Sequence, residues 1–320
     1  MFVFGMNTLM FLIIIYTKLA MGLLFLFIGA HFFIRSSSTL AALWKMPPFL
    51  IGVLLVGLGT SLPEWLVATT AAWKGVGQMS VGNAIGSNIA NMGLILGITA
   101  LIKPLCIKKR VLKVEFPLYL VVALIVGIIV FFKRLTLVEG LLLGIIFLSY
   151  VAMLLFDMFS DKKNDPLPTP IPEATSPSPY STSITAQLLI CFLSLVVVLV
   201  SAEFIVQGAS ALARYYHISD LIIGLTIVAV GTSLPELAAS VSSVLHNQVD
   251  IAVGNVIGSN IFNLTAVLAM PALLQPSQLP SSVFSRHYLT MMILSFVVLI
   301  PLYFTRKHII GRRKAQESRL

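Results

Sequence analysis

Charged side chains are scarce in this sequence: Asp, Glu, Lys and Arg together make up 10% of the 320 residues. An average soluble domain carries about 25%, so this chain cannot cover a surface exposed to water. The shortage excludes a soluble enzyme, a disordered chain and a coiled coil. Cysteine is also rare, since Cys106 and Cys191 are too few for a disulfide framework and lie in different segments. Hydrophobic residues make up 58% of the chain, which indicates an integral membrane protein.

Long apolar runs are what the sequence has in abundance. A transmembrane helix needs about 20 mostly apolar residues, and the runs are continuous, unlike the alternating pattern of a transmembrane β-barrel. Residues 1–11 are also apolar, but no small-residue cleavage site follows them, so we interpret them as an extension of an uncleaved first helix. We therefore expect an all-α polytopic membrane protein with nine spans, at roughly 12–34, 49–72, 79–101, 115–132, 136–157, 184–213, 219–245, 250–274 and 286–304.

The longest polar stretch divides the chain. Residues 158–183 contain six prolines, which favour extended, unpacked backbone. We interpret this stretch as a cytoplasmic linker between residues 1–157, with five spans, and residues 184–320, with four spans and a basic tail.

Lys and Arg are distributed unevenly over the loops. With the N-terminus outside, 15 of the 21 fall in loops or a tail that face the cytoplasm, as the positive-inside rule requires. We therefore predict an external N-terminus and a cytoplasmic C-terminus. The formal charge of +9 is then explained by basic loops beside a membrane surface, and no nucleic-acid partner is expected.

An offset of 172 residues lays one half of the chain on the other. GTSLPE occurs at 59–64 and again at 231–236, and VGNAIGSNIAN at 81–91 matches VGNVIGSNIFN at 253–263 in nine of eleven positions. Five predicted spans separate the copies, so they enter the membrane from opposite sides. This is an inverted-topology repeat, a pattern that builds many secondary transporters.

Two glutamates occupy equivalent positions of the repeat, within apolar spans. An ionised carboxylate there costs about 2.5–3.5 kcal/mol on the lenient insertion scale, so Glu64 and Glu236 need a stabilising partner, for which a cation is the obvious candidate. A proline precedes each glutamate and disturbs the helix, which frees carbonyl oxygens. Hydroxyl and amide side chains recur at helical spacing in both copies, namely Thr60, Ser87 and Asn91, and Thr232, Ser259 and Asn263. All these groups offer oxygen, which favours Ca²⁺ or Na⁺ over zinc or copper.

The doubled GTSLPE and GNxIGSNIxN motifs resemble the α-repeats of the sodium/calcium exchanger family of the cation/Ca²⁺ antiporter superfamily. The likeness is greatest to bacterial inner-membrane members that lack regulatory domains. It implies two inverted sets of five helices, with ion sites clustered between the second, third, seventh and eighth helices. Proton/calcium exchangers typically carry a GNxxE motif, which this sequence lacks.

The resemblance also implies roles for individual residues. Glu64 and Glu236 would be the carboxylates shared by Ca²⁺ and Na⁺, and Thr60 and Thr232 would lie near the Ca²⁺ position. The remaining implied ligands are Ser61, Ser87, Ser233 and Ser259 at the Na⁺ positions, Asn91 and Asn263 beside the middle of the site, and the carbonyls of Gly57 and Ala229.

The chain departs from the family pattern in two ways. Many relatives carry Asp at one of the two asparagine positions, whereas Asn91 and Asn263 are both neutral, which leaves a site charge of −2. The tenth helix is also missing from the predicted set, because the segment after the ninth span is too short and too basic to cross. We expect weaker packing or altered assembly from this loss, with the site intact.

The sequence thus predicts a secondary antiporter that exchanges Ca²⁺ for Na⁺ by alternating access in a cell (inner) membrane. Its partners would be these ions and the lipid bilayer, with no cofactor and an oligomeric state left open. Three alternatives stand beside this prediction: a cation/H⁺ antiporter using the same glutamates, a shortened paralogue that does not transport, and an intramembrane protease. The protease is disfavoured because no G-x-S-x-G or paired-Asp motif accompanies Ser61 or Ser233, so no enzymatic activity is expected.

Overall fold

The computed structural model describes residues 2–75, 77–109, 111–160, 183–217, 229–304 and 309–310. Seven of its helices are long and apolar enough to cross a membrane, and eight if the bent pair 48–60 and 62–73 counts as one span. The all-α architecture is therefore confirmed. The predicted span 219–245 falls partly outside the described residues, as does most of the predicted linker.

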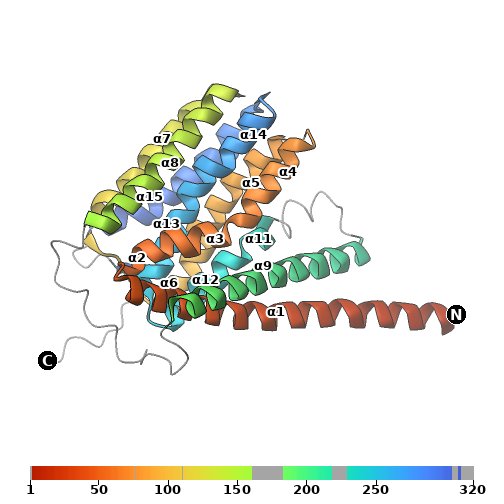
Figure 1. The fold of residues 1–320 in the computed structure, drawn as a ribbon. Coiled ribbons are helices and arrows are strands. Elements are labelled where there is room, and N and C mark those ends of the chain that lie inside the picture. Colours follow the sequence, from red (N-terminus) through yellow and green to blue (C-terminus); the bar gives the residue numbers. More distant parts are fainter. Residues whose placement is uncertain are drawn as a thin grey trace.

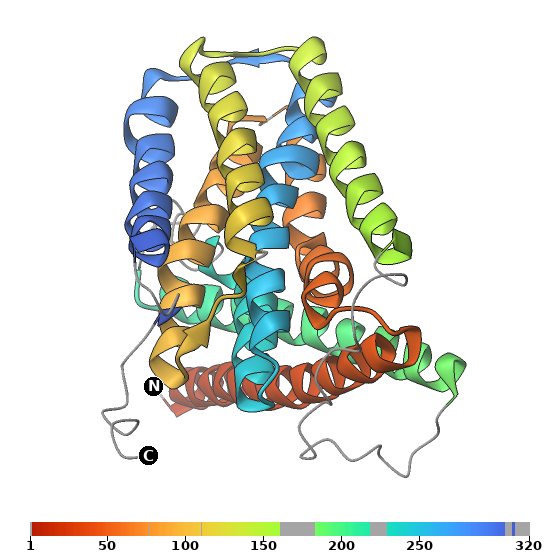
Figure 2. The ribbon, with the colours of Figure 1, turned by 90° about the vertical axis from the view of Figure 1, so that its left-hand side faces the viewer.

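Two long helices, α1 (Phe2–Trp44) and α9 (Ile184–Tyr215), lie side by side and cross beneath the steeper helices of the bundle (Figures 1 and 2). Phe11 contacts Tyr215 near one end of the pair, and Ser37 contacts Cys191 near the other, so the helices are antiparallel. Between these contacts Gly22 faces Ile205 so closely that a Cβ would sit 2.7 Å from its Cγ1. Corresponding helices of the two halves thus run in opposite directions.

The predicted first span, 12–34, is too short, because α1 continues to Trp44. The prediction stopped at Arg35, where the apolar run ends. The helix passes through the polar stretch that follows, since Ser36 and Ser37 donate hydrogen bonds to the Phe33 carbonyl one turn back. At about 1.5 Å per residue its 43 residues extend roughly 65 Å, well beyond a hydrocarbon core of about 30 Å, so the helix must tilt or extend beyond the core.

Broken helices follow α1. The second span consists of α2 (Pro48–Ile51), the π-helical η1 (Gly52–Gly57), α3 (Leu58–Thr60) and α4 (Leu62–Trp73). It bends by 41° at Ser61, two residues before Pro63. The second half has the same break at Ser233, between α11 (Ala229–Thr232) and α12 (Leu234–Leu245). Pro63 and Pro235 each lie in the first turn of the new helix, where proline is tolerated.

The other helices complete the bundle seen in Figure 1. In the first half they are α5 (Gly77–Ala90), η2 (Asn91–Ile95), α6 (Leu96–Ile102), η3 (Val111–Glu115), α7 (Phe116–Phe131) and α8 (Leu137–Ser160). In the second half they are α13 (Val249–Phe262), η7 (Asn263–Val267), α14 (Leu268–Leu274), η8 (Val283–Tyr288) and α15 (Leu289–Phe304). Buried apolar side chains along these helices form the main core.

The 172-residue offset holds in the structure as well as in the sequence. It maps α4 onto α12, α5 onto α13, η2 onto η7 and α6 onto α14 residue for residue. It also pairs positions of positive φ whose residues differ: Lys45 (55°) with His217 (59°), and Gly75 (84°) with Asn247 (62°). The repeat therefore specifies backbone geometry even where the side chains have diverged.

Each half of the chain stabilises a turn in the other half through side-chain hydrogen bonds. Gln275 accepts a hydrogen bond from the Gly77 amide (2.7 Å) and donates one to the Gly75 carbonyl (2.7 Å), which holds the α4–α5 turn. At the equivalent position of the first half, the Lys103 ammonium donates to the side-chain oxygen of Asn247 in the α12–α13 turn. The two halves interlock at both ends of the bundle.

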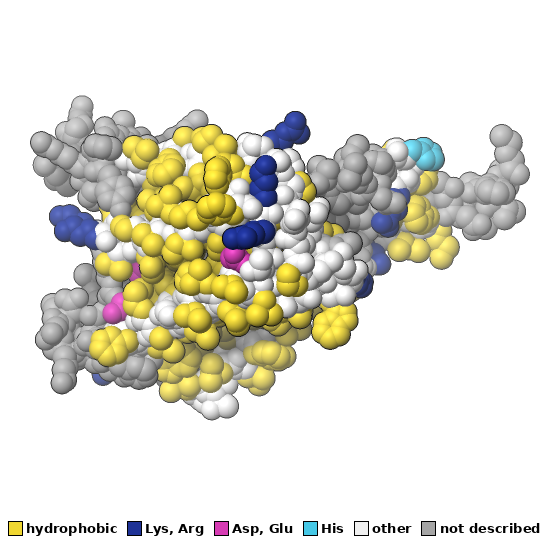
Figure 3. Space-filling view, turned by 90° about the horizontal axis from the view of Figure 1, so that it is seen from above, with side chains coloured by type: hydrophobic (Ala, Val, Ile, Leu, Met, Phe, Trp, Pro, Cys, Tyr) yellow, Lys and Arg dark blue, Asp and Glu magenta, His cyan; other side chains and the backbone are white. Residues whose placement is uncertain are grey.

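Short strands form two further links. β1 (Leu105–Cys106) pairs with β4 (Ile309–Ile310), and β2 (Arg134–Leu135) pairs with β3 (Ser277–Gln278), both antiparallel. β4 lies where the offset would place the start of a helix equivalent to α8. Hydrophobic side chains cover much of the face in Figure 3, with scattered Lys and Arg.

Candidate ion-binding site

The two repeated motifs converge at the middle of the bundle. Glu64 in the first turn of α4 and Glu236 in the first turn of α12 are each only 1% exposed. The breaks before these helices bring both carboxylates inside, next to residues of α5 and α13. Each ionised carboxylate places a charge in a non-aqueous interior, and its surroundings must offset the cost of burying that charge.

Serines tie each carboxylate to the opposite half. The Ser61 hydroxyl donates to Oε1 of Glu236 at 2.8 Å, and the Ser233 hydroxyl donates to Oε1 of Glu64 at 3.4 Å. The two bonds are equivalent under the offset. Both predicted serines therefore lie in the site, and each acts on the glutamate of the other repeat.

Asparagines of α5 and α13 support the backbone at the breaks. The Asn83 amide donates to the Glu64 carbonyl at 3.3 Å, and the Asn255 amide donates to the Glu236 carbonyl at 3.1 Å. The Thr60 hydroxyl donates to the side-chain oxygen of Asn255 at 3.3 Å. The two asparagines were not among the predicted site residues, although both belong to the repeated GNxIGSN motif.

A second asparagine of the motif joins the halves in a similar way. The Asn88 amide donates to the Asn260 carbonyl at 3.1 Å, and the Asn91 amide donates to the Asn260 side-chain oxygen at 3.0 Å. The Ser259 hydroxyl donates to the Gly57 carbonyl at 3.2 Å, so that predicted carbonyl ligand also borders the site. Thr232, also predicted, is partly buried at the end of α11.

Several buried oxygens of the site have no hydrogen-bond partner among the described residues. Five of them belong to ligands predicted from the sequence: Oε2 of Glu64, Oε2 of Glu236, Oγ of Ser87, Oδ1 of Asn91 and Oδ1 of Asn263. A buried polar atom without a partner costs about 1–3 kcal/mol, so a cluster of five requires compensation. All five are hard oxygen donors, the type that Ca²⁺ and Na⁺ prefer.

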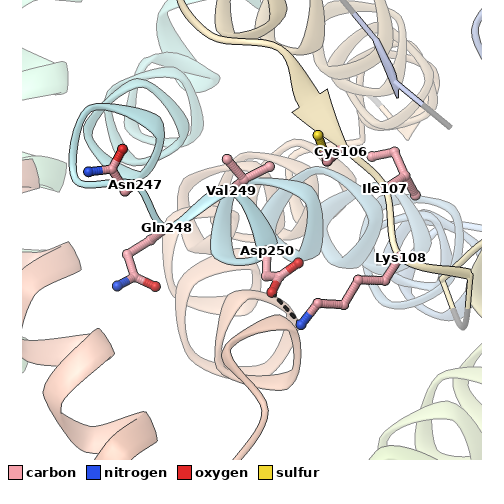
Figure 4. A pocket seen from close by; sticks show the side chains of 7 residues that line it. All are labelled: Cys106, Ile107, Lys108, Asn247, Gln248, Val249 and Asp250. Carbon is pink, nitrogen blue, oxygen red and sulfur yellow. Dashed lines mark ion pairs between the residues drawn. The ribbon is translucent and has the colours of Figure 1, made fainter. Parts of the chain in front are cut away.

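No basic side chain in the described part of the chain forms an ion pair with either glutamate. The ion pair found there joins Lys108 to Asp250 at 2.7 Å, at the rim of a pocket of about 340 Å³ beside the α12–α13 turn (Figure 4). That pocket is lined by a different set of residues from the carboxylate cluster: Cys106, Ile107, Lys108, Asn247, Gln248, Val249 and Asp250.

Comparison with known proteins agrees with this geometry. The chain is 38% identical over 279 residues to the putative antiporter CaxA of Alkalimonas amylolytica, covering 87% of this chain and 86% of the relative. It is 35% identical over 280 residues to inner membrane protein YrbG of Escherichia coli, with the same coverage. It is 30% identical to the sodium/calcium exchanger MaX1 of Methanosarcina acetivorans, covering 81% of this chain and 82% of that protein.

Solved structures show the same fold. The sodium-calcium exchanger NCX_Mj, soaked with 2.5 mM Na⁺ and 0.1 mM Ca²⁺, superposes with a TM-score of 0.77 at 30% identity, covering 94% of this chain and 93% of that one. Residues 10–156 and 186–316 match the sodium/calcium exchanger protein family. The chain is therefore a member of the sodium/calcium exchanger family.

Proposed function

We propose that this protein is a secondary antiporter that exchanges Ca²⁺ for Na⁺ at a site centred on Glu64 and Glu236. The observation that carries the proposal is the pair of buried carboxylates, one from each inverted repeat and each held by a serine of the other repeat. Membership of an exchanger family supports transport over enzymatic activity, and in this proposal the bound ions are cargo.

The ligand inventory suits the proposed ions. Two ionised glutamates supply a charge of −2, which one Ca²⁺ or two Na⁺ would neutralise. Ca²⁺ takes about six to eight oxygens, and the carboxylates supply up to four. We assign the rest to the oxygens that surround them, from Thr60, Thr232, Ser61, Ser233, Ser87, Ser259, Asn91 and Asn263.

Shared ligands provide the coupling. If Ca²⁺ and Na⁺ both require the two glutamates, occupancy by one ion excludes the other. Each ion then leaves the site before its competitor enters, and a gradient of one drives movement of the other.

Alternating access is assigned to α1 and α9. Side chains of both helices, including Leu26, Ala30, Val198 and Ala202, pack with Ala238 of α12. With the predicted orientation, α12 ends at the cytoplasmic side of an inner membrane, so this packing closes the site from the cytoplasm. Movement of the α1–α9 pair from α12 toward α4 would reverse the access.

The test is ⁴⁵Ca²⁺ uptake into proteoliposomes loaded with Na⁺, against vesicles without Na⁺. We expect uptake that requires internal Na⁺ and disappears in Glu236→Gln. Glu203→Gln is the matched control, because Glu203 is exposed and accepts a hydrogen bond from Gln207 one turn away on its own helix. Uptake driven by a pH gradient without Na⁺ would identify a cation/H⁺ antiporter instead, and absence of both fluxes would identify a non-transporting paralogue.

A further inference from the structure

Two histidines from different helices meet where α1 packs on α12. The ring centroids of His31, on α1, and His246, directly after α12, are 4.6 Å apart with an interplanar angle of 61°. Neither residue belongs to the repeated motifs or to the carboxylate site. Imidazole is a ligand for transition metals, whereas the carboxylate site offers oxygen alone.

The ring of His246 is held in a tautomer that leaves one nitrogen free to bind a metal. Its Nδ1 lies 2.7 Å from the Ser242 carbonyl, which can only accept, so Nδ1 carries the proton and donates. The lone pair of the neutral ring is therefore on Nε2. Ligating histidines commonly hold their second nitrogen in this way, which fixes the tautomer and the ring orientation.

Ser242 also fixes the partner helix. Its hydroxyl donates to the Ala30 carbonyl at 3.2 Å, so one residue orients His246 and anchors α1 next to His31. His31 is exposed, which leaves its ring accessible to an ion from outside. Arg35, one turn along α1, adds a positive charge near His31 and limits the affinity.

The equivalent place in the other repeat has no such pair. The offset puts Glu203 at the position of His31 and Lys74 at the position of His246. Glu203 bonds to Gln207 on its own helix, and the described residues contain no ion pair between Glu203 and Lys74. A ligand of the histidines would therefore act at one end of the molecule only.

We propose that His31 and His246 bind a borderline transition-metal ion, such as Ni²⁺ or Zn²⁺, and that the ion clamps α1 to α12. Two imidazole nitrogens would bind the metal and water would complete its coordination. Because the site bridges two helices that must separate for access to alternate, an occupied clamp holds the protein in the arrangement described here. The binding itself does not depend on the proposed exchange activity.

Calorimetric titration of tag-free, detergent-solubilised full-length protein with Ni²⁺ tests the site directly. We expect one binding event, weakened at least tenfold by His31→Gln and by His246→Gln, and preserved in the matched control His217→Gln. Unchanged binding in both variants, or an equal loss in the control, would overturn the proposal. Thermal unfolding without metal identifies any variant that fails to fold, and His31→Ala at the exposed position then replaces it.

The effect of the bound metal on movement of α1 is measured as inhibition of Ca²⁺ exchange by Ni²⁺. In wild-type proteoliposomes that exchange Ca²⁺, saturating Ni²⁺ should inhibit at least fivefold, and His31→Gln should remove the inhibition. Ni²⁺ binding without any exchange would refute the proposed function and leave the metal site standing, whereas exchange without Ni²⁺ binding would do the reverse.

Discussion

The helices α4 and α12 are equivalent under the 172-residue offset, but α1 and α9 bury positions on α12 whose counterparts on α4 are exposed. Ala238 on α12 is 4% exposed, whereas its counterpart on α4, Leu66, is 54% exposed. Ser242 on α12 is buried and bonded to α1, while its counterpart Thr70 is exposed and bonds to carbonyls of its own helix. The carboxylates at the start of both helices are equally buried. The repeat is thus symmetric at its centre and asymmetric in what packs around it.

The largest expected effect tests the symmetric centre. Glu64→Gln and Glu236→Gln should each lower Ca²⁺ flux at least 100-fold, because each removes half of the negative charge that binds the ion. The measurement is ⁴⁵Ca²⁺ flux at equal amounts of reconstituted protein, with Glu203→Gln as the control. Near-normal flux in either variant would show that the two repeats do not contribute equally.

Chemical labelling probes the asymmetric surroundings. With Cys106 and Cys191 replaced by serine, Thr70→Cys should react at least tenfold faster than Ser242→Cys with a water-soluble thiol reagent in detergent-solubilised protein, because position 70 is exposed and position 242 is buried. The measurement is the rate of modification under Na⁺ and under Ca²⁺. Equal rates of modification under every condition would contradict the proposal that α1 and α9 pack over one repeat at a time.

The two serines that donate hydrogen bonds to the glutamate of the other repeat allow a finer comparison. The Ser61–Glu236 bond (2.8 Å) is shorter than the Ser233–Glu64 bond (3.4 Å), and hydrogen bonds to charged groups contribute about 1.5–3 kcal/mol. Ser61→Ala should therefore raise the KM for Ca²⁺ about tenfold, and Ser233→Ala about threefold. A larger effect from Ser233→Ala would reverse the predicted order.

Low pH should inhibit Ca²⁺ flux by protonating the glutamates of both repeats. Protons compete with cations for the glutamates, so Ca²⁺ flux should fall severalfold as pH is lowered from 8 to 5, with inhibition relieved by higher Ca²⁺. The measurement is flux against Ca²⁺ concentration at each pH. A flat profile would argue against a shared pair of carboxylate ligands.

The smallest effect concerns packing. A Cβ at Gly258 would lie 2.9 Å from the Cα of Val53, whereas one at its counterpart Gly86 meets no described atom within 4 Å. Overpacking costs about 1–3 kcal/mol, so Gly258→Ala should lower Tm by several degrees, and Gly86→Ala should leave it unchanged. Equal shifts in Tm for the two variants would contradict the predicted difference in packing between the repeats.

Much of this organisation could be predicted from the sequence. Apolar runs located the spans, and the doubled motif located the repeat, both glutamates and their serines. The pairing of Ser61 with Glu236, 175 positions away, could not be predicted, because it depends on how the two copies interlock. Nor could the extension of α1 beyond Arg35, since serines that bond to their own helix resemble a loop in composition. Nearly identical motifs also cannot tell which copy is covered, because covering depends on α1 and α9.

The turn contacts of Gln275 and Lys103, together with the two strand pairs, bear on how the chain folds. Each half completes its structure only by receiving groups from the other, so the halves should fold as one cooperative unit. A chain severed between α8 and α9 should yield fragments that are stable only when produced together. The same reciprocity would be met by two copies of a single half inserted in opposite orientations, which gives gene duplication a physical starting point.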